Sequence, residues 1–200
     1  MQLLPIQRAL ISVTDKSGLE ELCSVLAEGG VHLVSTGGTR KRILEAGHQV
    51  QSVSELTGFP EILDGRVKTL HPRVHAGVLA DKDKPEHLRT LDENRIAPFD
   101  LICVNLYDFA RASHTTSDLA QLVEEIDIGG PPLLRAGAKN FHSVTVLPDP
   151  KFYPEFQEEL QSSGFQISLD FRQRMAATVF EITSTYDAMI AQALAQGRSV

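Results

Sequence analysis

Short apolar runs alternate with helix-like patterns through most of the chain, and this alternation restricts the possible folds more than any other feature. Runs typical of strands lie at residues 9–13, 31–34, 50–53, 100–105 and 144–147. Segments with helical spacing or helix-start signals lie at residues 19–28, 40–46, 85–94, 117–126 and 131–140. Strands that alternate with helices form a parallel sheet with helices on both faces. We therefore predict an α/β fold with a three-layer arrangement around a parallel sheet.

The last part of the chain has a different pattern. No strand-like run follows Pro148, and helical spacing continues at residues 151–163 and 168–196. A stripe in the second helical segment consists of Met175, Val179, Ile182, Tyr186, Met189 and Ala193. We expect this stripe to pack against the sheet domain or against a partner subunit. The sequence thus predicts a core at residues 1–148 and a C-terminal helical extension of the same domain at residues 149–200.

Composition excludes several classes of protein. The formal net charge of −7 argues against general binding of nucleic acids, because such binding needs a basic surface. The two cysteines, Cys23 and Cys103, lie far apart and form no metal-binding or redox motif. No segment has the length of a membrane span, and the N-terminus lacks the pattern of a signal peptide. We expect a cytoplasmic protein with a buried thiol at Cys103.

Two turns follow the first two predicted strands and begin helices. Residues 12–18 read Ser-Val-Thr-Asp-Lys-Ser-Gly, and residues 35–39 read Ser-Thr-Gly-Gly-Thr. Hydroxyl groups and free N–H groups at a helix N-terminus bind anions, and Lys16 adds a full charge. Each turn alone is more often a simple helix cap, and Ser17 and Glu20 have the spacing of a capping box. Two such turns at the same edge of one sheet favour a site for a monophosphate.

Residues 66–72 place two cations in an otherwise acidic chain. The segment reads Arg-Val-Lys-Thr-Leu-His-Pro and belongs to a long irregular stretch, residues 57–80. In an extended backbone Arg66 and Lys68 point to the same side, and Pro72 is expected to prevent a helix. Long loops in compact domains are usually functional or disordered. The segment is either a solvated loop or a site for an anion or a developing negative charge.

Two further segments place polar groups at the ends of predicted elements. Asp127 precedes a Gly-Gly break, and Lys139 ends the helix that follows, a pattern that an ordinary capped helix also shows. Asn105 and Tyr107 follow the strand at 100–105, where a packed tyrosine is the simpler interpretation. Either segment could contribute groups to the same edge of the sheet as the two turns.

Metal and serine-hydrolase chemistry have little support. His71 and His75 have the spacing of two zinc ligands on a helix, but the proline between them argues against a helix there. No acidic motif accompanies the pair, and we predict no metal site. The chain also has no G-x-S-x-G sequence, which a nucleophilic serine of the α/β-hydrolase type requires.

The combination of these segments is far more specific than any of them alone. Motifs that recur together in one family, in the same order, lie at residues 11–18, 35–39, 54–61, 65–72, 75–77, 105–107, 126–130 and 135–140. The chain thereby resembles the IMP cyclohydrolase domain of the bifunctional purine-biosynthesis protein. The resemblance implies a methylglyoxal-synthase-like fold. It also implies the last step of de novo purine biosynthesis, the dehydrative closure of 5-formamidoimidazole-4-carboxamide ribonucleotide (FAICAR) to inosine 5′-monophosphate (IMP).

The resemblance further implies roles for single residues. Lys68 and Tyr107 would stabilise the oxyanion on the former formyl oxygen, and Asp127 and Lys139 would transfer protons. The residues implied to hold the 5′-phosphate are Ser12, Lys16, Ser35, Gly37, Gly38 and Thr39. The residues implied to line the base pocket are Arg66, Thr69, Asn105, Ile128 and Gly129. The division of roles among Lys68, Asp127 and Lys139 stays open.

The family also implies the class of enzyme and its partners. It is a hydrolase that acts on C–N bonds in cyclic amidines and that needs neither a metal nor an organic cofactor. The resemblance further implies a homodimer, although the oligomeric state stays open, and a separate or fused folate-dependent transformylase that would supply FAICAR. That transformylase domain is absent from these 200 residues, so we expect a stand-alone cyclohydrolase or an excised domain.

Two other functions occur on the same fold. One is a regulatory module that binds nucleotides without chemistry, like the allosteric domain of carbamoyl phosphate synthetases, and the other is methylglyoxal synthase. The joint presence of the implied catalytic residues favours the enzyme over the module, and Lys-Thr-Leu-His-Pro at 68–72 favours a purine substrate over a triose phosphate. Asp108, Gly137 and Phe141 depart from the common family pattern of Pro, Ala and His. We expect Gly137 to destabilise its helix by about 1 kcal/mol.

Overall fold

The computed structural model describes residues 2–116 and 118–196 and is built on a parallel sheet. In spatial order the strands are β4 (Gln51–Ser52), β3 (His32–Ser35), β2 (Arg8–Ser12), β5 (Leu101–Val104) and β6 (Thr145–Leu147). Every neighbouring pair is parallel, and Ile11 in the central strand lies opposite Ser35 on one side and Cys103 on the other. The predicted fold class is thus confirmed, although the strand predicted at 50–53 is limited to β4.

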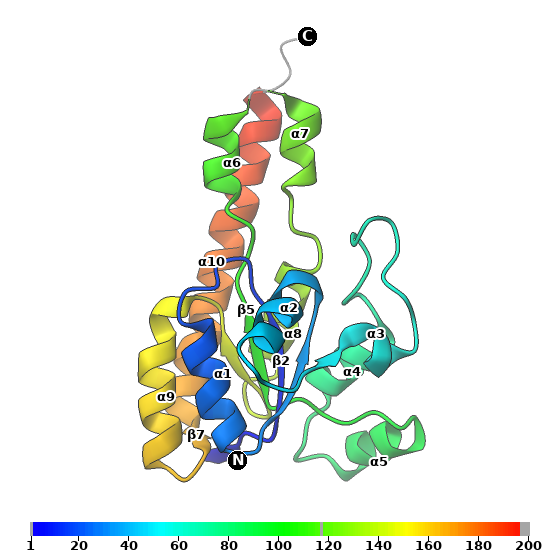
Figure 1. Cartoon of the computed structure of the whole chain (residues 1–200), viewed down its shortest axis with the longest axis vertical. Helices are drawn as coiled ribbons and strands as arrows, with labels where there is room; N and C mark the ends of the chain where they lie inside the picture. The colour runs from blue at the N-terminus through cyan, green and yellow to red at the C-terminus, as the bar shows by residue number, and fades with distance from the viewer. Residues whose placement is uncertain (1, 117, 197–200) are drawn as a thin grey trace.

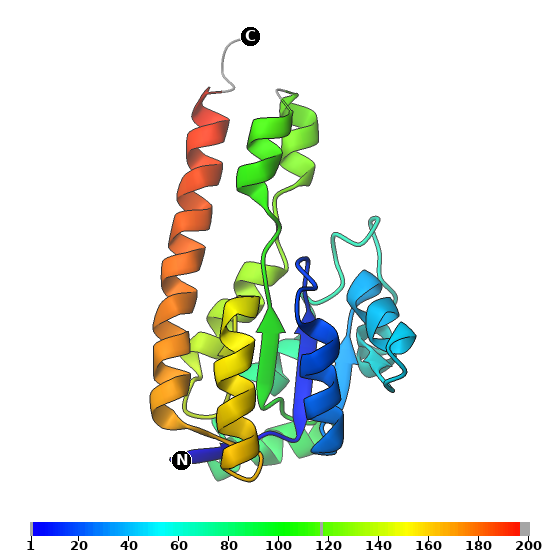
Figure 2. The same cartoon turned by 60° about the vertical axis from the view of Figure 1, so that its left-hand side comes forward.

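Helices cover both faces of the sheet (Figures 1 and 2). On one face α8 (Gly130–Lys139) contacts β5 and β6, with α4 (Pro72–Leu79) and the long helix α10 (Leu169–Gln196) beside it. On the other face α1 (Leu19–Glu28) packs beside α2 (Gly37–Glu45) and α9 (Tyr153–Ser162). The remaining described helices are α5 (Pro85–Glu93) and the short 3₁₀ helix η1 (Pro150–Phe152), besides α3, α6 and α7, which are introduced below. A continuous hydrophobic core that extends from Leu4 to Val179 fills the space between the layers.

A two-stranded sheet joins the N-terminus to the C-terminal part of the chain. β1 (Leu3–Pro5) pairs antiparallel with β7 (Gln166–Ser168). The prediction that no strand follows Pro148 is therefore wrong, because a three-residue strand with one buried side chain, Ile167, shows no readable alternation. The division of the chain at residue 148 stays a prediction, and residues 197–200 of the predicted extension lie outside the described residues.

Pro72 begins a helix instead of preventing one. It is the first residue of α4, and the ring of the N-cap residue His71 accepts a hydrogen bond from the N–H of Arg73. Proline is tolerated in the first turn, because its missing N–H would have no partner within the helix. The stretch predicted to be irregular, residues 57–80, thus contains α4, and a β-bridge joins Ile62 to Val67.

Other helix starts also differ from the predictions. Gly18 is the N-cap of α1 in a left-handed conformation, and Ser17 hydrogen-bonds to Asp15, so the predicted capping box is wrong. A capping box forms instead between Ser52 and Glu55, at the start of the unpredicted helix α3 (Val53–Thr57). The helix predicted at 117–126 is α7 (Leu119–Glu124), and residue 117 lies outside the described residues.

Three helical segments project beyond the carboxyl edge of the sheet (Figure 1). They are α6 (Phe109–Thr115), which the sequence pattern did not predict, α7, and the C-terminal part of α10; we call them the helical projection. Its small core consists of Phe109, Leu122 and Tyr186, none of which is more than 8% exposed. The predicted stripe of α10 therefore packs within this chain, along the main core at Met175 and along the projection at Tyr186.

Both cysteines are buried free thiols, as predicted for Cys103. Burial raises the pKa of the Cys23 and Cys103 thiols to about 12, so both are inert near neutral pH. None of the helices in residues 2–116 and 118–196 has both the length and the apolar character needed to cross a membrane.

Gly137 tests how closely α8 packs on the sheet. A methyl group added at Gly137 would lie 2.9 Å from Cγ1 of Val146, on the stiff side chain of a buried strand residue. Alanine favours the helix by about 1 kcal/mol, but overpacking of a core costs about 1–3 kcal/mol. We expect Gly137→Ala to lower the free energy of unfolding measured by urea denaturation.

The smaller side chain of the variant Val146→Ala provides the control for this prediction. In the Val146→Ala background the added methyl group has room, so Gly137→Ala should be neutral or stabilising there. Greater stability of Gly137→Ala in the wild-type background would show that the packing argument is wrong.

Candidate functional site

A cavity of about 1100 Å³ lies at the carboxyl edge of the parallel sheet. Its walls come from the ends of the strands, the base of the helical projection and the long loop before α4, which stand at the same end of the molecule in Figures 1 and 2. The lining residues lie in segments 12–14, 36–39, 63–70, 123–124 and 126–130, with Lys16, Val104, Tyr107 and Leu133. The topology thus brings the predicted motifs together from distant parts of the chain.

One end of the cavity is the N-terminus of α2. The N-cap residue Thr36 does not cap the helix with its side chain, because its hydroxyl hydrogen-bonds to the hydroxyl of Ser12 at 2.8 Å. Gly37 has a φ of 38°, a backbone conformation that favours glycine. The N–H groups of the first turn therefore face the cavity without a side-chain cap. A helix terminus of this kind binds anions.

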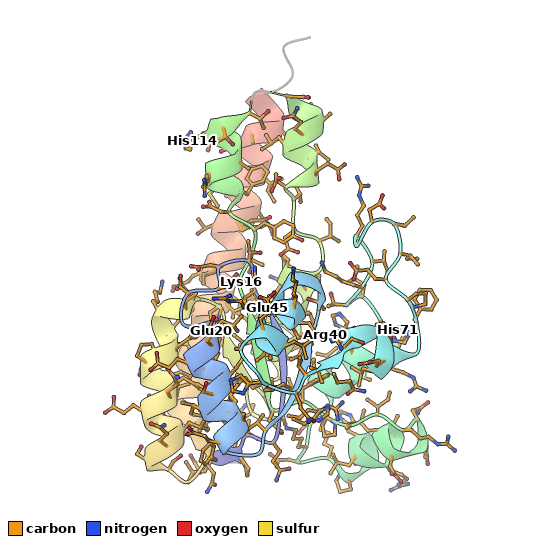
Figure 3. All side chains as sticks on the ribbon, in the orientation of Figure 1. Lys16, Glu20, Arg40, Glu45, His71 and His114 are labelled. Atoms are coloured by element: carbon orange, nitrogen blue, oxygen red, sulfur yellow. The ribbon has the colours of Figure 1, made fainter. Side chains whose placement is uncertain are left out.

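Lys16 adds a positive charge to this end of the cavity. Its ammonium group lies 3.2 Å from the carbonyl oxygen of Thr14, in the turn that follows β2. In Figure 3 Lys16 lies at the edge of the sheet nearest the helical projection. His114 lies on the outer side of α6, far from Lys16. We call Ser12, Lys16, Thr36, Gly37 and Gly38 the anion cradle.

Three predicted phosphate or base ligands use their side-chain polar groups to hold the turns of the cradle in place. Ser35 is fully buried, and its hydroxyl donates to the carbonyl of Ile11 at 2.6 Å. Asn105 lies outside the cavity wall, and its amide oxygen accepts the N–H groups of Thr14 and Asp15 at 2.6 and 3.0 Å.

Thr39 lines the cavity, but its hydroxyl exchanges two hydrogen bonds with the backbone of Val13, at 2.9 and 3.0 Å. Together with Ser35 and Asn105 it holds the turns in place, because the Ser35 and Thr39 hydroxyls and the Asn105 amide oxygen form hydrogen bonds within the chain.

The cavity brings together three of the four predicted catalytic residues. Lys68, Tyr107 and Asp127 line it, as do the predicted base-pocket residues Arg66, Thr69, Ile128 and Gly129. Two distant segments meet closely here, because a Cβ atom added at Gly129 would lie 2.8 Å from Oγ1 of Thr69. The segments around Lys68 and Asp127 thus form one continuous wall.

Lys139 lies away from this wall. It is the last residue of α8, whose first residue, Gly130, lies beside Asp127. At 1.5 Å per residue, the helix separates Lys139 from Gly130 by about 13 Å along its axis. The Lys139 side chain is exposed at that far end. Lys139 is therefore not among the residues that line the cavity with Asp127, and the role predicted for it stays a prediction.

Asp127 is held in an environment that changes its acidity. Its Oδ1 atom accepts the N–H of Gly130 at 2.8 Å, and a Cβ atom added at Gly130 would lie 2.4 Å from Oδ2, so this approach requires glycine. Burial raises the pKa of Asp127 above its usual range, while the Gly130 N–H and the Lys68 ammonium group act in the opposite direction. A carboxyl group with a raised pKa beside a cation is suited to proton transfer.

An ion pair connects two sides of the cavity mouth. Arg66, in the loop before α4, pairs with Glu124 at the end of α7, and both side chains are largely exposed. Three residues that line the cavity were not predicted as site residues, namely Glu124, Thr14 and Thr36. Both threonines belong to turns that were recognised, so their hydroxyl groups could have been included. Glu124 has no sequence signal, because its partner lies 58 residues away.

No metal centre is present among residues 2–116 and 118–196, where no group of three His, Cys, Asp or Glu side chains is placed to hold an ion. The prediction that Pro72 prevents a helix between His71 and His75 is wrong, because His71 is the N-cap of α4 and His75 lies within it. Burial lowers the pKa of His75, and the ring of His71 is occupied by its capping bond.

Comparison with known proteins identifies the family. The model of the MGS-like domain matches residues 18–132. The chain belongs to this family. The model named AICARFT/IMPCHase bienzyme matches residues 137–200 of this MGS-like chain. Together the two matches confirm the fold class and the resemblance that the motifs predicted.

Curated relatives of this MGS-like chain are bifunctional purine biosynthesis proteins PurH. The protein from Mesorhizobium japonicum is 51% identical over 94% of the chain, and that from Corynebacterium glutamicum (strain R) is 53% identical over 93%. The protein from Leptospira biflexa is 47% identical over 94% of the chain. The chain spans only 35–37% of the length of these relatives. The likeness therefore concerns one part of a longer protein.

A solved structure, titled "Crystal structure of ForH", has the same fold. It superimposes with a TM-score of 0.87 at 33% identity and covers 97% of this chain and 100% of its own. The C-terminal helices are included in this agreement, because the matched region extends over nearly the whole chain.

The raised pKa of Asp127 predicts that the stability of the fold depends on pH in a way that can be measured. Because the pKa is higher in the folded chain than in the unfolded one, the folded state binds more protons between these two values, and stability falls as the pH rises through that window. The side-chain amide of the variant Asp127→Asn cannot ionise but can still accept the N–H of Gly130. We expect Asp127→Asn to equal the wild type near pH 3 and to exceed its unfolding free energy increasingly towards neutral pH.

Urea denaturation at a series of pH values measures this difference, and Asp92→Asn, on the exposed surface of α5, is the control. If Asp127→Asn is less stable than the wild type at neutral pH, the carboxylate is stabilised by its surroundings and the assigned direction is wrong.

Proposed function

We propose that this chain is an IMP cyclohydrolase domain that converts FAICAR to IMP and water. The observation that carries the proposal is a single cavity with an uncapped helix N-terminus at one end and with Lys68 and Asp127 at another part of its wall. Support also comes from relatives about half identical to this chain, which are named as bifunctional purine biosynthesis proteins. The regulatory-module alternative does not require these groups to share a cavity.

The substrate is bound by its two ends in this proposal. The 5′-phosphate accepts hydrogen bonds from the first-turn N–H groups of α2 and from the hydroxyls of Ser12 and Thr36, and Lys16 balances its charge. The imidazole with its formamido and carboxamide groups then lies against the wall formed by Lys68, Thr69 and the segment 127–129. Binding by both ends holds the two reacting groups of one molecule together, which removes most of the entropic barrier.

Ring closure begins when the carboxamide nitrogen attacks the formyl carbon. A C–N bond forms, the formyl C=O bond becomes a single bond, and negative charge develops on its oxygen. The ammonium group of Lys68 and the hydroxyl of Tyr107 are the groups on the wall that can stabilise this charge. A donor aimed at a developing oxyanion contributes a rate factor of about 10²–10³.

Proton transfer and loss of water complete the reaction. The attacking nitrogen loses one proton, and the oxygen leaves as water after it has gained two. The second proton comes from the former formamide nitrogen, and a C=N bond forms in the ring. We assign the transfers to Asp127, because burial gives its carboxyl group a raised pKa beside Lys68. Lys139 has no part in this mechanism within one chain.

The same proposal includes the enzyme class and the partners. The reaction is acid–base chemistry within one molecule, so we propose that it needs no metal or organic cofactor. We further propose a hydrolase that forms homodimers, for which α10 still offers the exposed apolar residues Phe180 and Leu194. A cytoplasmic location accords with two free buried thiols. A transformylase, fused or separate, would supply FAICAR.

Turnover of FAICAR tests the proposal directly. We expect the purified chain to form IMP, followed by its absorbance, without added folate or metal. Binding of FAICAR or IMP without turnover would reject the enzyme and support the regulatory module.

Lys68→Ala tests the assigned oxyanion contact. We expect kcat to fall by about 10²–10³-fold, because a charge stabilised only in the transition state is lost. KM should change much less, since Lys68 is not part of the anion cradle. Lys84→Ala, which removes an exposed lysine at the start of α5, is the matched control. A wild-type kcat in Lys68→Ala would remove this residue from the mechanism.

A further inference from the structure

The C-terminal helix reaches the candidate site through one side chain. The backbone N–H of Asp127 donates a hydrogen bond to the hydroxyl oxygen of Tyr186 at 2.8 Å. The same hydroxyl donates to the carbonyl oxygen of Glu125 at 3.4 Å. Tyr186 thus bridges both ends of the short segment 125–127, which follows α7 and leads to the cavity wall.

The ring of Tyr186 is fixed in this position by its neighbours. The side chain is 4% exposed and belongs to the core of the helical projection with Phe109 and Leu122. The ring meets that of Phe109 edge-on, at a centroid distance of 6.1 Å and an interplanar angle of 70°. Aromatic contacts of this geometry are favourable beyond the area they bury. The hydroxyl is therefore presented to segment 125–127 by a packed, rigid support.

The chemistry of the hydroxyl matches both of its contacts. A phenol can accept one hydrogen bond and donate another at the same time. Burial raises the pKa of Tyr186, and the nearby Asp127 carboxylate acts in the same direction, so the hydroxyl stays protonated at neutral pH. The Tyr186 hydroxyl therefore retains both of its hydrogen bonds at neutral pH.

Asp127 is consequently fixed on both sides. Tyr186 holds its backbone N–H, and the first N–H of α8, that of Gly130, holds its carboxylate at 2.8 Å. Loss of the Tyr186 contact would leave a partly buried N–H without its partner and free the segment that carries the carboxylate. A small misplacement of a reacting group can cost a large part of the rate.

We propose that Tyr186 is a positioning residue, which holds the Asp127 carboxylate in register with Lys68 for proton transfer. This inference rests on the proposed cyclohydrolase function for its catalytic part. It gives the helical projection a role in the reaction, because Phe109 and Leu122 support the ring that orients the acid. Tyr186 itself touches the backbone of Asp127 and Glu125, and no contact with substrate is assigned to it.

Tyr186→Phe tests the proposal, because it keeps the packed ring and removes only the bridging hydroxyl. We expect kcat for FAICAR to fall about tenfold while KM stays within about twofold, since a misplaced acid slows proton transfer without weakening the anion cradle. Hydrogen exchange of the Asp127 amide, measured by NMR, should become at least about tenfold faster, because its acceptor is gone.

Tyr153→Phe is the matched control. Tyr153 is 2% exposed, and its hydroxyl also has a buried hydrogen-bond partner, the sulfur of Cys103 at 3.2 Å, away from the cavity. We expect this variant to keep the wild-type kcat and the wild-type exchange rate at Asp127.

The possible outcomes separate this inference from the proposed function. A wild-type protein that does not turn over FAICAR would overturn the proposed function and the catalytic part of the inference, while faster exchange at Asp127 in Tyr186→Phe would still support the positioning contact. Wild-type exchange at Asp127 in Tyr186→Phe would overturn the contact itself. An equal loss of kcat in Tyr153→Phe would reduce the effect to general destabilisation and overturn the positioning role.

Discussion

The parallel pairing of β2 with β3 on one side and β5 on the other determines where the functional groups of this chain lie. In this register Ile11 lies opposite Ser35 and Cys103, so three strands end at the same level. The turns that follow them carry the anion cradle and Tyr107 to one edge of the sheet. The Ser35 hydroxyl donates to the carbonyl of Ile11, and the side-chain oxygens of Thr39 and Asn105 accept backbone N–H groups, so that these turns are fixed to one another. The cavity is thus a consequence of strand register, and most of the polar groups behind its wall serve to preserve it.

Burial and the neighbouring groups have opposite effects on the pKa of Asp127. Burial disfavours the carboxylate, while the Gly130 N–H and the Lys68 ammonium group favour it, and burial prevails. A buried carboxyl group with a raised pKa lowers the stability of the fold at neutral pH, but it can hold or release a proton. Gly129 and Gly130 permit the close approach of Thr69 and of the carboxylate to this backbone. Tyr186 adds a contact from α10, so that Asp127 is held by α8 through Gly130 and by the helical projection through Tyr186.

The sequence predicted the fold class and several of the segments that line the cavity from local patterns, whereas the roles of single residues came from the family resemblance and stay predictions. Apolar runs such as 101–104 indicate buried strands, and turns with hydroxyls and glycines after strands indicate anion sites. The errors have physical causes. Pro72 starts α4 because its ring is compatible with a first turn, and β7 is too short to show alternation. The length of α8 places Lys139 outside the cavity, and the role predicted for Lys139 stays a prediction. The contacts of Tyr186 and Glu124 join residues about sixty positions apart, which no local pattern reveals.

In the proposed function one cavity binds a nucleotide in a fixed direction, with its phosphate on α2 and its base at the reacting groups. A crystal structure of the chain with IMP would establish this direction. We expect phosphate oxygens within hydrogen-bonding distance of the Gly37 and Gly38 N–H groups, and the pyrimidine edge of the base between Lys68 and Asp127. A phosphate bound beside Arg66 and Lys68, with the base at the N-terminus of α2, would show that the proposed direction is wrong.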